Sequence, residues 1–168
     1  VTYAGAVCIS SRKGKKSKRG AEMKTLGVVG LGLIGGSFVK AYRETKDWRV
    51  LGTDKNDKIT QLAIMAEDIE AELTHRNLRE CDLVLIAVYP EAAIEYLEKN
   101  GEYISPDAMV IDCCGVKRAV CDKCFKIADR YGFTYVGGHP MAGRHFSGYK
   151  YSTEELYRGA PMVIVPGR

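Results

Sequence analysis

The sequence predicts an α/β fold built on a doubly wound, mostly parallel sheet with helices on both faces. Three observations lead to this prediction. Apolar runs of strand length alternate with helix-like segments along most of the chain. Residues 83–88 (LVLIAV) are apolar without alternation, as in a central strand that helices cover on both faces. A glycine-rich turn joins the first apolar run to the first helix-like segment.

The predicted elements follow one another in a regular order. In the first half they are a strand at 25–29, a glycine turn at 30–37 leading into a helix that ends near residue 43, a strand at 49–53, a helix whose polar start at 55–58 leads into 59–66, and the central strand at 83–88. In the second half they are a helix at 90–97, a strand at 109–111, a helix at 117–131, a strand at 134–136, a loop at 137–151, a short helix at 154–158 and a last strand at 162–165. Pro90 suits the first position of its helix because its missing N–H would have no partner there.

Length and composition predict a single domain. With 168 residues, 46% apolar and 27% charged, the chain can bury one core but not two. No apolar run reaches the roughly 20 residues that a membrane span needs, so no membrane partner is expected. Because Met23-Lys24 directly precedes the first predicted strand, we interpret residues 1–22 as a disordered extension and residues 23–168 as the folded domain.

Positive charge is concentrated in the extension. The formal net charge is +4, yet residues 1–22 carry six basic side chains against Glu22, which leaves the rest of the chain close to neutral. A specific nucleic-acid partner is therefore not expected for the domain, and binding through residues 12–19 is an alternative that rests on the extension alone. Since the apolar stretch precedes the basic run, the order is wrong for a secretory signal, and we expect a cytoplasmic location.

Six cysteines, at positions 8, 81, 113, 114, 121 and 124, include a C-x-x-C pair at 121 and 124. In a chain without an export signal these are expected to be reduced thiols. The C-x-x-C pair lies inside a predicted amphipathic helix, whereas a redox-active pair should open one. We therefore interpret Cys113, Cys114, Cys121 and Cys124 as small core residues and predict no metal site, with zinc as the alternative.

The glycine turn has the context of a dinucleotide-binding loop of the Rossmann type. Its sequence is Gly30-Leu31-Gly32-Leu33-Ile34-Gly35, and it follows a predicted strand and opens a predicted helix. The first glycine permits the tight turn, the second lets the backbone approach a pyrophosphate, and the third lets helix and strand pack closely. We expect these six residues, with Val88 at the end of the central strand, to bind the cofactor.

Asp54 ends the second predicted strand, where an acidic residue binds the ribose hydroxyls of a dinucleotide. Its charge would repel a 2′-phosphate, which favours NAD over NADP, although the neighbouring Lys55 weakens that preference. The alternative is that Asp54 caps the helix that follows.

A histidine follows a later strand at the carboxyl end of the sheet, where doubly wound folds place ligands. His139 lies in the segment Gly-Gly-His-Pro-Met-Ala-Gly at 137–143, between glycines and a proline. A neutral imidazole can accept the proton of a hydroxyl whose carbon loses hydride, since its reference pKa of about 6.5 suits transfer near neutral pH. We predict that His139 is catalytic, with a structural histidine as the alternative.

Four segments resemble the prephenate and arogenate dehydrogenases of tyrosine biosynthesis. They are GLGLIGGS at 30–37, DCCGVK at 112–117, GGHPMAGRHFSG at 137–148 and GAPMVIVP at 159–166, and the similarity runs from about Met23 to the end. The resemblance implies oxidative decarboxylation of prephenate with NAD, giving 4-hydroxyphenylpyruvate, with His139 deprotonating the ring hydroxyl. Arogenate is the alternative substrate, and the substrate is in either case a small molecule.

Two positions depart from the commoner pattern of that family. Many members have a serine where this chain has Gly115, and its hydroxyl orients the histidine. Some have an acidic residue where His145 stands near the substrate entrance, so a histidine there would alter the local charge; a solvated loop residue is the alternative. Arg144 and Ser147, with Gly115 and His145, are candidate substrate contacts.

The resemblance also implies a helical domain after this one, which supplies dimer contacts and cations for the substrate carboxylates. We expect that domain to be absent here, the homodimer to need it, and the chain alone to bind NAD but turn over substrate poorly. Two other functions remain open. One is another Rossmann dehydrogenase, such as a 3-hydroxyacid dehydrogenase or imine reductase, which leaves the histidine segment unexplained; the other is a non-catalytic NAD-binding domain.

Overall fold

A seven-stranded sheet forms the centre of the molecule. The computed structural model describes residues 23–167, so the predicted extension at 1–22, including Cys8, lies outside the described residues. The strand order is β3-β2-β1-β4-β5-β6-β7, and all neighbouring strands are parallel except β6 and β7. The chain therefore leaves β1 in one direction and returns to its other side with β4, which makes the gap between these two strands the topological switch point.

The first half of the chain builds one side of the sheet. Its elements are β1 (Lys24–Val29), α1 (Leu33–Thr45), β2 (Trp48–Thr53), α2 (Asp57–Met65) and β3 (Ala71–Glu72). Helix α2 begins after Asn56, whose side chain accepts a hydrogen bond from the Lys58 N–H. Asn56, and not Asp54, is therefore the residue that caps this helix.

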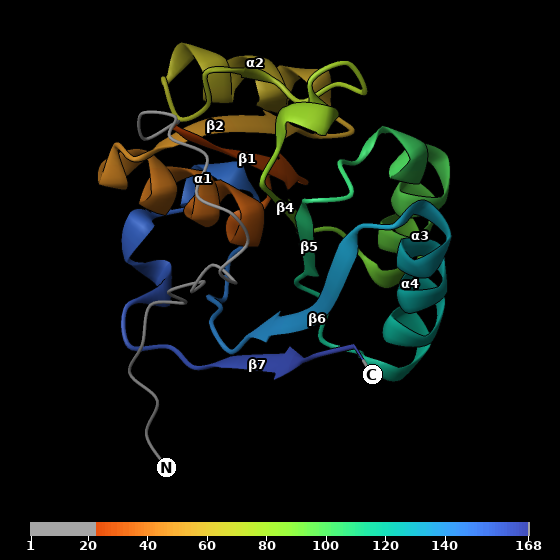
Figure 1. The fold of residues 1–168 in the computed structure, drawn as a ribbon. Coiled ribbons are helices and arrows are strands. Elements are labelled where there is room, and N and C mark those ends of the chain that lie inside the picture. The colour runs from red at the N-terminus through yellow and green to blue at the C-terminus, as the bar shows by residue number, and fades with distance from the viewer. Residues whose placement is uncertain (1–22, 168) are drawn as a thin grey trace.

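The second half builds the other side. Its elements are the 3₁₀ turn η1 (Leu78–Glu80), β4 (Leu83–Ile86), α3 (Pro90–Asn100), η2 (Gly101–Tyr103), β5 (Met109–Asp112), α4 (Arg118–Tyr131), β6 (Thr134–Pro140), η3 (Tyr149–Tyr151), η4 (Glu154–Tyr157) and β7 (Met162–Val165). Pro90 stands in the first turn of α3, and Gly132 ends α4 with φ 88°. Figure 1 shows α3 and α4 side by side, across the sheet from α1.

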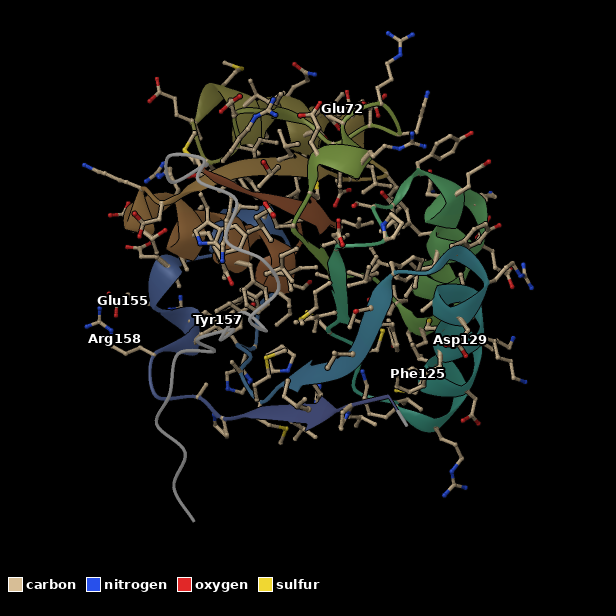
Figure 2. The ribbon with its side chains drawn as sticks, viewed as in Figure 1. Glu72, Phe125, Asp129, Glu155, Tyr157 and Arg158 are labelled. Atoms are coloured by element: carbon tan, nitrogen blue, oxygen red, sulfur yellow. The ribbon has the colours of Figure 1, made fainter. Side chains whose placement is uncertain are left out.

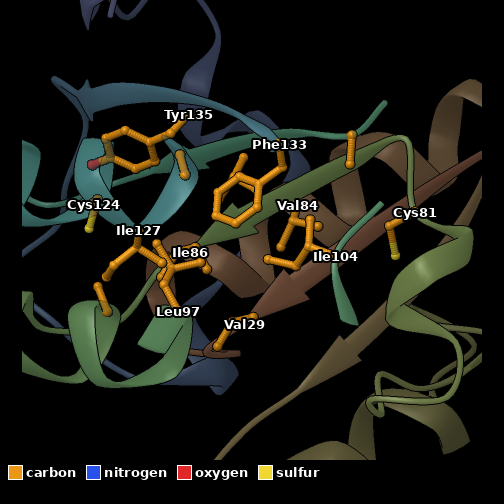
Figure 3. Packing of buried hydrophobic residues seen from close by; sticks show 14 of the residues in the cluster. Val29, Cys81, Val84, Ile86, Leu97, Ile104, Cys124, Ile127, Phe133 and Tyr135 are labelled. Atoms are coloured by element: carbon orange, nitrogen blue, oxygen red, sulfur yellow. The ribbon is translucent and has the colours of Figure 1, made fainter. Parts of the chain in front are cut away.

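Each face of the sheet has its own apolar core. Side chains of α3 and α4 pack on one face, and Figure 3 shows Leu97 of α3 and Ile127 of α4 against Ile86 of β4. Side chains of α1 and α2, including Val39 and Ala63, pack on the other face. The doubly wound, mostly parallel α/β fold predicted from the sequence is thus confirmed.

Strand β6 is longer than predicted, and this changes the setting of the histidine. The predicted loop at 137–151 begins too early, because β7 returns antiparallel to β6 and pairs His139 with Val163 and Pro140 with Met162. His139 therefore lies in a strand rather than in a loop. The predicted short helix at 154–158 is the 3₁₀ turn η4, and β4 ends at Ile86, two residues before the predicted end.

The turn η4 packs on the first helix. Tyr157 points from η4 to α1, where its hydroxyl donates to the Ile34 carbonyl at 2.6 Å and its ring stacks on Phe38 at 4.2 Å (Figure 2). Within residues 23–167 there is no helix with the length and apolar character needed to cross a membrane.

Candidate functional site

A cleft of about 860 Å³ opens at the carboxyl ends of the strands. It extends from the glycine loop before α1 to the segment after β6, across the switch point between β1 and β4. Of the site residues predicted from the sequence, those that line it are Gly30, Gly32, Leu33, Ile34, Asp54, Val88, Gly115, Arg144, His145 and Ser147. A second cavity, of about 280 Å³, lies beside Trp48 at the start of β2, away from these strand ends.

The glycines of the loop have different surroundings. Gly30 has φ +89°, and a Cβ there would lie 2.6 Å from the Ala87 carbonyl oxygen at the end of β4. A Cβ on Gly35 would lie 1.8 Å from the Gly30 carbonyl oxygen, so α1 begins directly against the loop. At Gly32 an added Cβ would meet nothing within 4 Å. The protein's own packing thus requires glycine at 30 and 35, whereas Gly32 faces open space.

Helix α1 presents an uncompensated N-terminus to the cleft. Gly32 is its N-cap without a side-chain hydrogen bond, and no acidic residue stands in its first turn. The first N–H groups of a helix have no partner within the helix and carry a partial positive charge. With Leu33 and Ile34 on the cleft wall, this helix end can bind a phosphate through its backbone.

Asp54 connects the end of β2 to the glycine loop. Its Oδ2 accepts the Leu31 N–H at 2.8 Å, and its Oδ1 accepts the Asn56 N–H at 3.0 Å. Each carboxylate oxygen can accept a further hydrogen bond from a ligand in the cleft. Leu31 was predicted to bind the cofactor, but its side chain is fully buried and its N–H is already used by Asp54.

His139 lies behind Gly115 and is not itself on the wall of the cleft. A Cβ at Gly115 would be 3.4 Å from the His139 Cε1 and 3.9 Å from its Nδ1. That Nδ1 is buried and has no hydrogen-bond partner among the described residues. The same Cβ would also be 3.9 Å from Nε2, so the position where many relatives are expected to carry a serine faces the Cε1 edge of the ring, equally far from its two nitrogens.

A buried carboxylate next to this histidine was not predicted from the sequence. Asp112 ends β5 and is fully buried. Its Oδ1 accepts the Tyr135 hydroxyl at 2.6 Å and the Gly138 N–H at 3.2 Å. Its Oδ2 accepts the Cys114 N–H at 2.9 Å and the Lys117 ammonium group, which also donates to the Gly138 carbonyl. Burial, followed by the hydrogen bond to Asp112, raises the pKa of Tyr135 and keeps its hydroxyl a donor.

The segment from Met141 to Gly148 covers the other side of the cleft. Arg144, His145 and Ser147, which were predicted from the sequence as substrate contacts, are exposed and line the cleft. The end of the segment is fixed to the first half of the chain, because the Tyr149 hydroxyl donates to Asp68 at 2.5 Å.

Four cysteines, Cys81, Cys114, Cys121 and Cys124, are positioned as core residues, whereas Cys113 is half-buried and lines the cleft. Cys121 and Cys124 are 6% and 0% exposed on α4, and burial raises the pKa of Cys124 to about 11. Burial likewise raises the pKa of Cys81 and of Cys114 to about 12, so these thiols stay protonated at neutral pH. Residues 23–167 contain no group of three or more side chains placed to bind a metal ion.

Known proteins resemble this chain over most of its length. Residues 38–168 match the family described as prephenate dehydrogenase, nucleotide-binding domain. The prephenate dehydrogenase of Bacillus subtilis (strain 168) is 32% identical over 149 residues, covering 86% of this chain and 40% of the relative. That of Lactococcus lactis subsp. cremoris (strain MG1363) is 26% identical over 145 residues, covering 84% and 41%. The chain thus spans about two fifths of the length of these curated relatives.

Solved structures agree with this relationship. Synechocystis arogenate dehydrogenase matches with a TM-score of 0.77 and 27% identity over 86% of this chain and 50% of that one. The prephenate dehydrogenase of A. aeolicus, solved with hydroxyphenyl propionate and NAD+, matches with a TM-score of 0.75 and 28% identity over 88% and 52%. An imine reductase from Myxococcus stipitatus, at 17% identity and a TM-score of 0.62, shares the fold alone. Because the family match covers more than half of its residues, the chain belongs to the prephenate dehydrogenase family, in which it corresponds to the nucleotide-binding domain.

Proposed function

We propose that this chain is the NAD-binding part of a dehydrogenase that oxidises and decarboxylates prephenate or arogenate. One observation carries the proposal: a single cleft at the switch point is lined by the glycine loop, by Asp54 and by Gly115, against which the His139 ring lies. The family match and the presence of NAD+ in the A. aeolicus complex agree with it.

The residues of the cleft fit a dinucleotide. The open space at Gly32 and the free N-terminus of α1 suit the pyrophosphate. Asp54 would accept the ribose hydroxyls with its remaining lone pairs, and its negative charge disfavours a 2′-phosphate, so NAD is preferred over NADP. When bound, NAD supplies the nicotinamide ring that takes the hydride.

His139 would act as the base. Its Nδ1 is enclosed, which leaves Nε2 as the nitrogen that can meet a substrate. Nε2 takes the proton of the ring hydroxyl as the carbon that bears this hydroxyl loses hydride, and that carbon becomes a carbonyl. The ring carboxylate then leaves as carbon dioxide and its bonding electrons enter the ring, which becomes an aromatic phenolate. This phenolate takes back the proton held by Nε2 and becomes the phenol. The chain's contribution is orientation and proton transfer.

Substrate carboxylates would meet the segment after β6. Arg144 is the cation on the cleft wall there, and guanidinium groups bind carboxylates through paired hydrogen bonds. His145 and Ser147 stand beside it and add hydrogen-bonding groups. Because prephenate and arogenate both carry carboxylates, these contacts would suit either substrate.

His139→Asn tests the role of the histidine. We expect turnover to fall at least a hundredfold, because a proton acceptor contributes roughly 10²–10⁴ to the rate. NAD affinity measured by calorimetry should stay within about twofold of wild type, since His139 is not on the cleft wall. Both proteins should be assayed as this chain and in a version extended to the full length of the relatives, with prephenate and with arogenate.

A non-catalytic NAD-binding domain is the second candidate, and the unpaired Nδ1 of His139 is the observation that favours it. The same variant separates the two functions. In a binding domain His139→Asn changes neither NAD affinity nor any rate, and absence of turnover in the extended wild-type protein would reject the enzyme.

A further inference from the structure

The carboxylate of Asp112 binds to both segments that enclose the His139 ring. One segment is β6, which it reaches through the Gly138 N–H immediately before the histidine. The other is the connection from β5 to α4, which it reaches through the Cys114 N–H immediately before Gly115. Because the His139 ring lies against Gly115, the two segments that set the ring's position share one acceptor.

Lys117 closes the same arrangement. Its ammonium group donates to Asp112 Oδ2, whereas the Gly138 N–H donates to Oδ1. The same ammonium group also donates to the Gly138 carbonyl. Residue 138 is therefore held at its N–H by Asp112 and at its C=O by Lys117. A Cβ at Gly138 would lie 2.5 Å from the Asp112 carbonyl oxygen, so the close approach of the two strands depends on glycine.

Asp112 and Lys117 form a buried ion pair at a position that apolar residues could fill if packing were the only requirement. Asp112 has no exposed surface and the Lys117 side chain is 17% exposed, so both charges are largely removed from water. Apolar residues of similar volume often stabilise a protein as well as a buried ion pair does. The charged pair differs from apolar residues in that it fixes the orientation of its partners, because each hydrogen bond sets the angle as well as the distance of the group that it holds.

We propose that Asp112 and Lys117 are positioning residues for His139, which fix its imidazole relative to the cleft by holding the peptide before it and the loop opposite it. The relevance to catalysis rests on the proposed function. The positioning itself is a property of the structure and can be measured without turnover.

Two variants test the arrangement in this chain. Asp112→Asn keeps the size but leaves one oxygen, so either the β6 donors or the loop donors lose their acceptor. Tyr135→Phe removes one donor and keeps the carboxylate with the other three. We expect the His139 ring signals, assigned by their loss in His139→Asn, to shift and broaden in ¹⁵N-edited NMR spectra. Exchange of the Gly138 amide hydrogen should accelerate about tenfold in Asp112→Asn and less in Tyr135→Phe.

A second buried carboxylate provides a matched control. Asp68 is 4% exposed and also accepts a tyrosine hydroxyl, that of Tyr149, at 2.5 Å. Its other partners are Arg43 and Lys40 of α1, so none of the contacts described for it comes from β5, β6 or α4. Tyr149→Phe should leave the His139 ring signals and the Gly138 exchange rate at their wild-type values.

The outcomes separate positioning from general stability. The proposal would be overturned if the His139 signals stayed unchanged in Tyr135→Phe and Lys117→Met. It would also be overturned if Tyr149→Phe changed these signals as much as those two variants do. These three variants still decide the question if Asp112→Asn does not fold. In an active extended protein, Tyr135→Phe should lower kcat several-fold at unchanged NAD affinity. If the extended wild type shows no turnover, the proposed function fails while the NMR and exchange results still judge the positioning.

Discussion

At residue 139 the protonation chemistry of one side chain depends on its neighbour. A neutral imidazole that accepts a proton at Nε2 carries its own hydrogen on Nδ1. Nδ1 is buried and none of residues 23–167 supplies it with a partner, and an unsatisfied buried donor costs about 1–3 kcal/mol. The tautomer that the proposed reaction needs is therefore the one that the surroundings of His139 do not support.

Gly115→Ser should correct this. A serine Cβ would lie 3.9 Å from both Nδ1 and Nε2, so a hydroxyl one bond further out is within reach of Nδ1, where the rotamer that turns it to that nitrogen can accept its hydrogen. We expect kcat to rise about tenfold, the factor that corresponds to about 1.4 kcal/mol. Gly115→Ala is the control, because it adds the carbon without the hydroxyl. Equal rates for the serine and alanine variants would contradict the role given to the hydroxyl.

Asp54→Asn should change cofactor choice. The amide leaves one oxygen for the two N–H groups that the carboxylate now accepts, those of Leu31 and Asn56, and removes the charge that repels a 2′-phosphate. We expect NAD to bind about tenfold more weakly, because hydrogen bonds to charged groups contribute about 1.5–3 kcal/mol. The ratio of NADP affinity to NAD affinity should rise, and calorimetry measures both affinities. Asp57→Asn, at the exposed start of α2, is the matched control and should change neither value.

At the scale of elements, local patterns predicted most of the fold and tertiary pairings account for the errors. The apolar run of β4 and the glycine loop before α1 indicated a parallel sheet with a dinucleotide site, because both signals lie in consecutive residues. The end of β6 could not be predicted, since β7 pairs with it from beyond the loop. The Asp112 arrangement joins three segments, namely β5, the connection from β5 to α4, and β6, and only its strand-end carboxylate and nearby lysine were visible in the sequence.

The junction of β1 and α1 separates a folding role from a binding role. Gly35→Ala would force a Cβ to within 1.8 Å of the Gly30 carbonyl oxygen, so we expect a loss of several kcal/mol in the free energy of unfolding. Gly32→Ala should cost about 0.5 kcal/mol or less but weaken NAD binding about tenfold, because its methyl group enters the open space. Urea unfolding and calorimetry measure the two effects. An unstable Gly32→Ala or a fully stable Gly35→Ala would show that the two positions have been misassigned.

At the scale of the whole molecule, buried thiols couple stability to alkaline pH. Burial raises the pKa of Cys124 from 9.0 to about 11, and that of Cys81 and of Cys114 to about 12. Below pH 9 both the folded and the unfolded chain keep these protons. Above it the unfolded chain loses them first, so stability falls as the pH rises from 9 towards 11 or 12.

Urea unfolding in the presence of a reductant should therefore show a midpoint that decreases from pH 8.5 to pH 10.5. Cys124→Ala removes one of the titrating groups and should show a shallower decrease, whatever its stability at pH 7.5. A midpoint that stays constant across this range would contradict the coupling.

The return of β7 along β6 has a consequence for how such a site diversifies. The segment that carries Arg144 and His145 leaves the sheet at Pro140 and rejoins it at Met162, the residue that pairs with Pro140. When both ends of a connecting segment are held in paired strands, doubling its length costs only roughly 0.6 kcal/mol in loop-closure free energy. Insertions and deletions can thus change which side chains this segment presents to the cleft, while the imidazole one residue before Pro140 keeps its place in the paired strands.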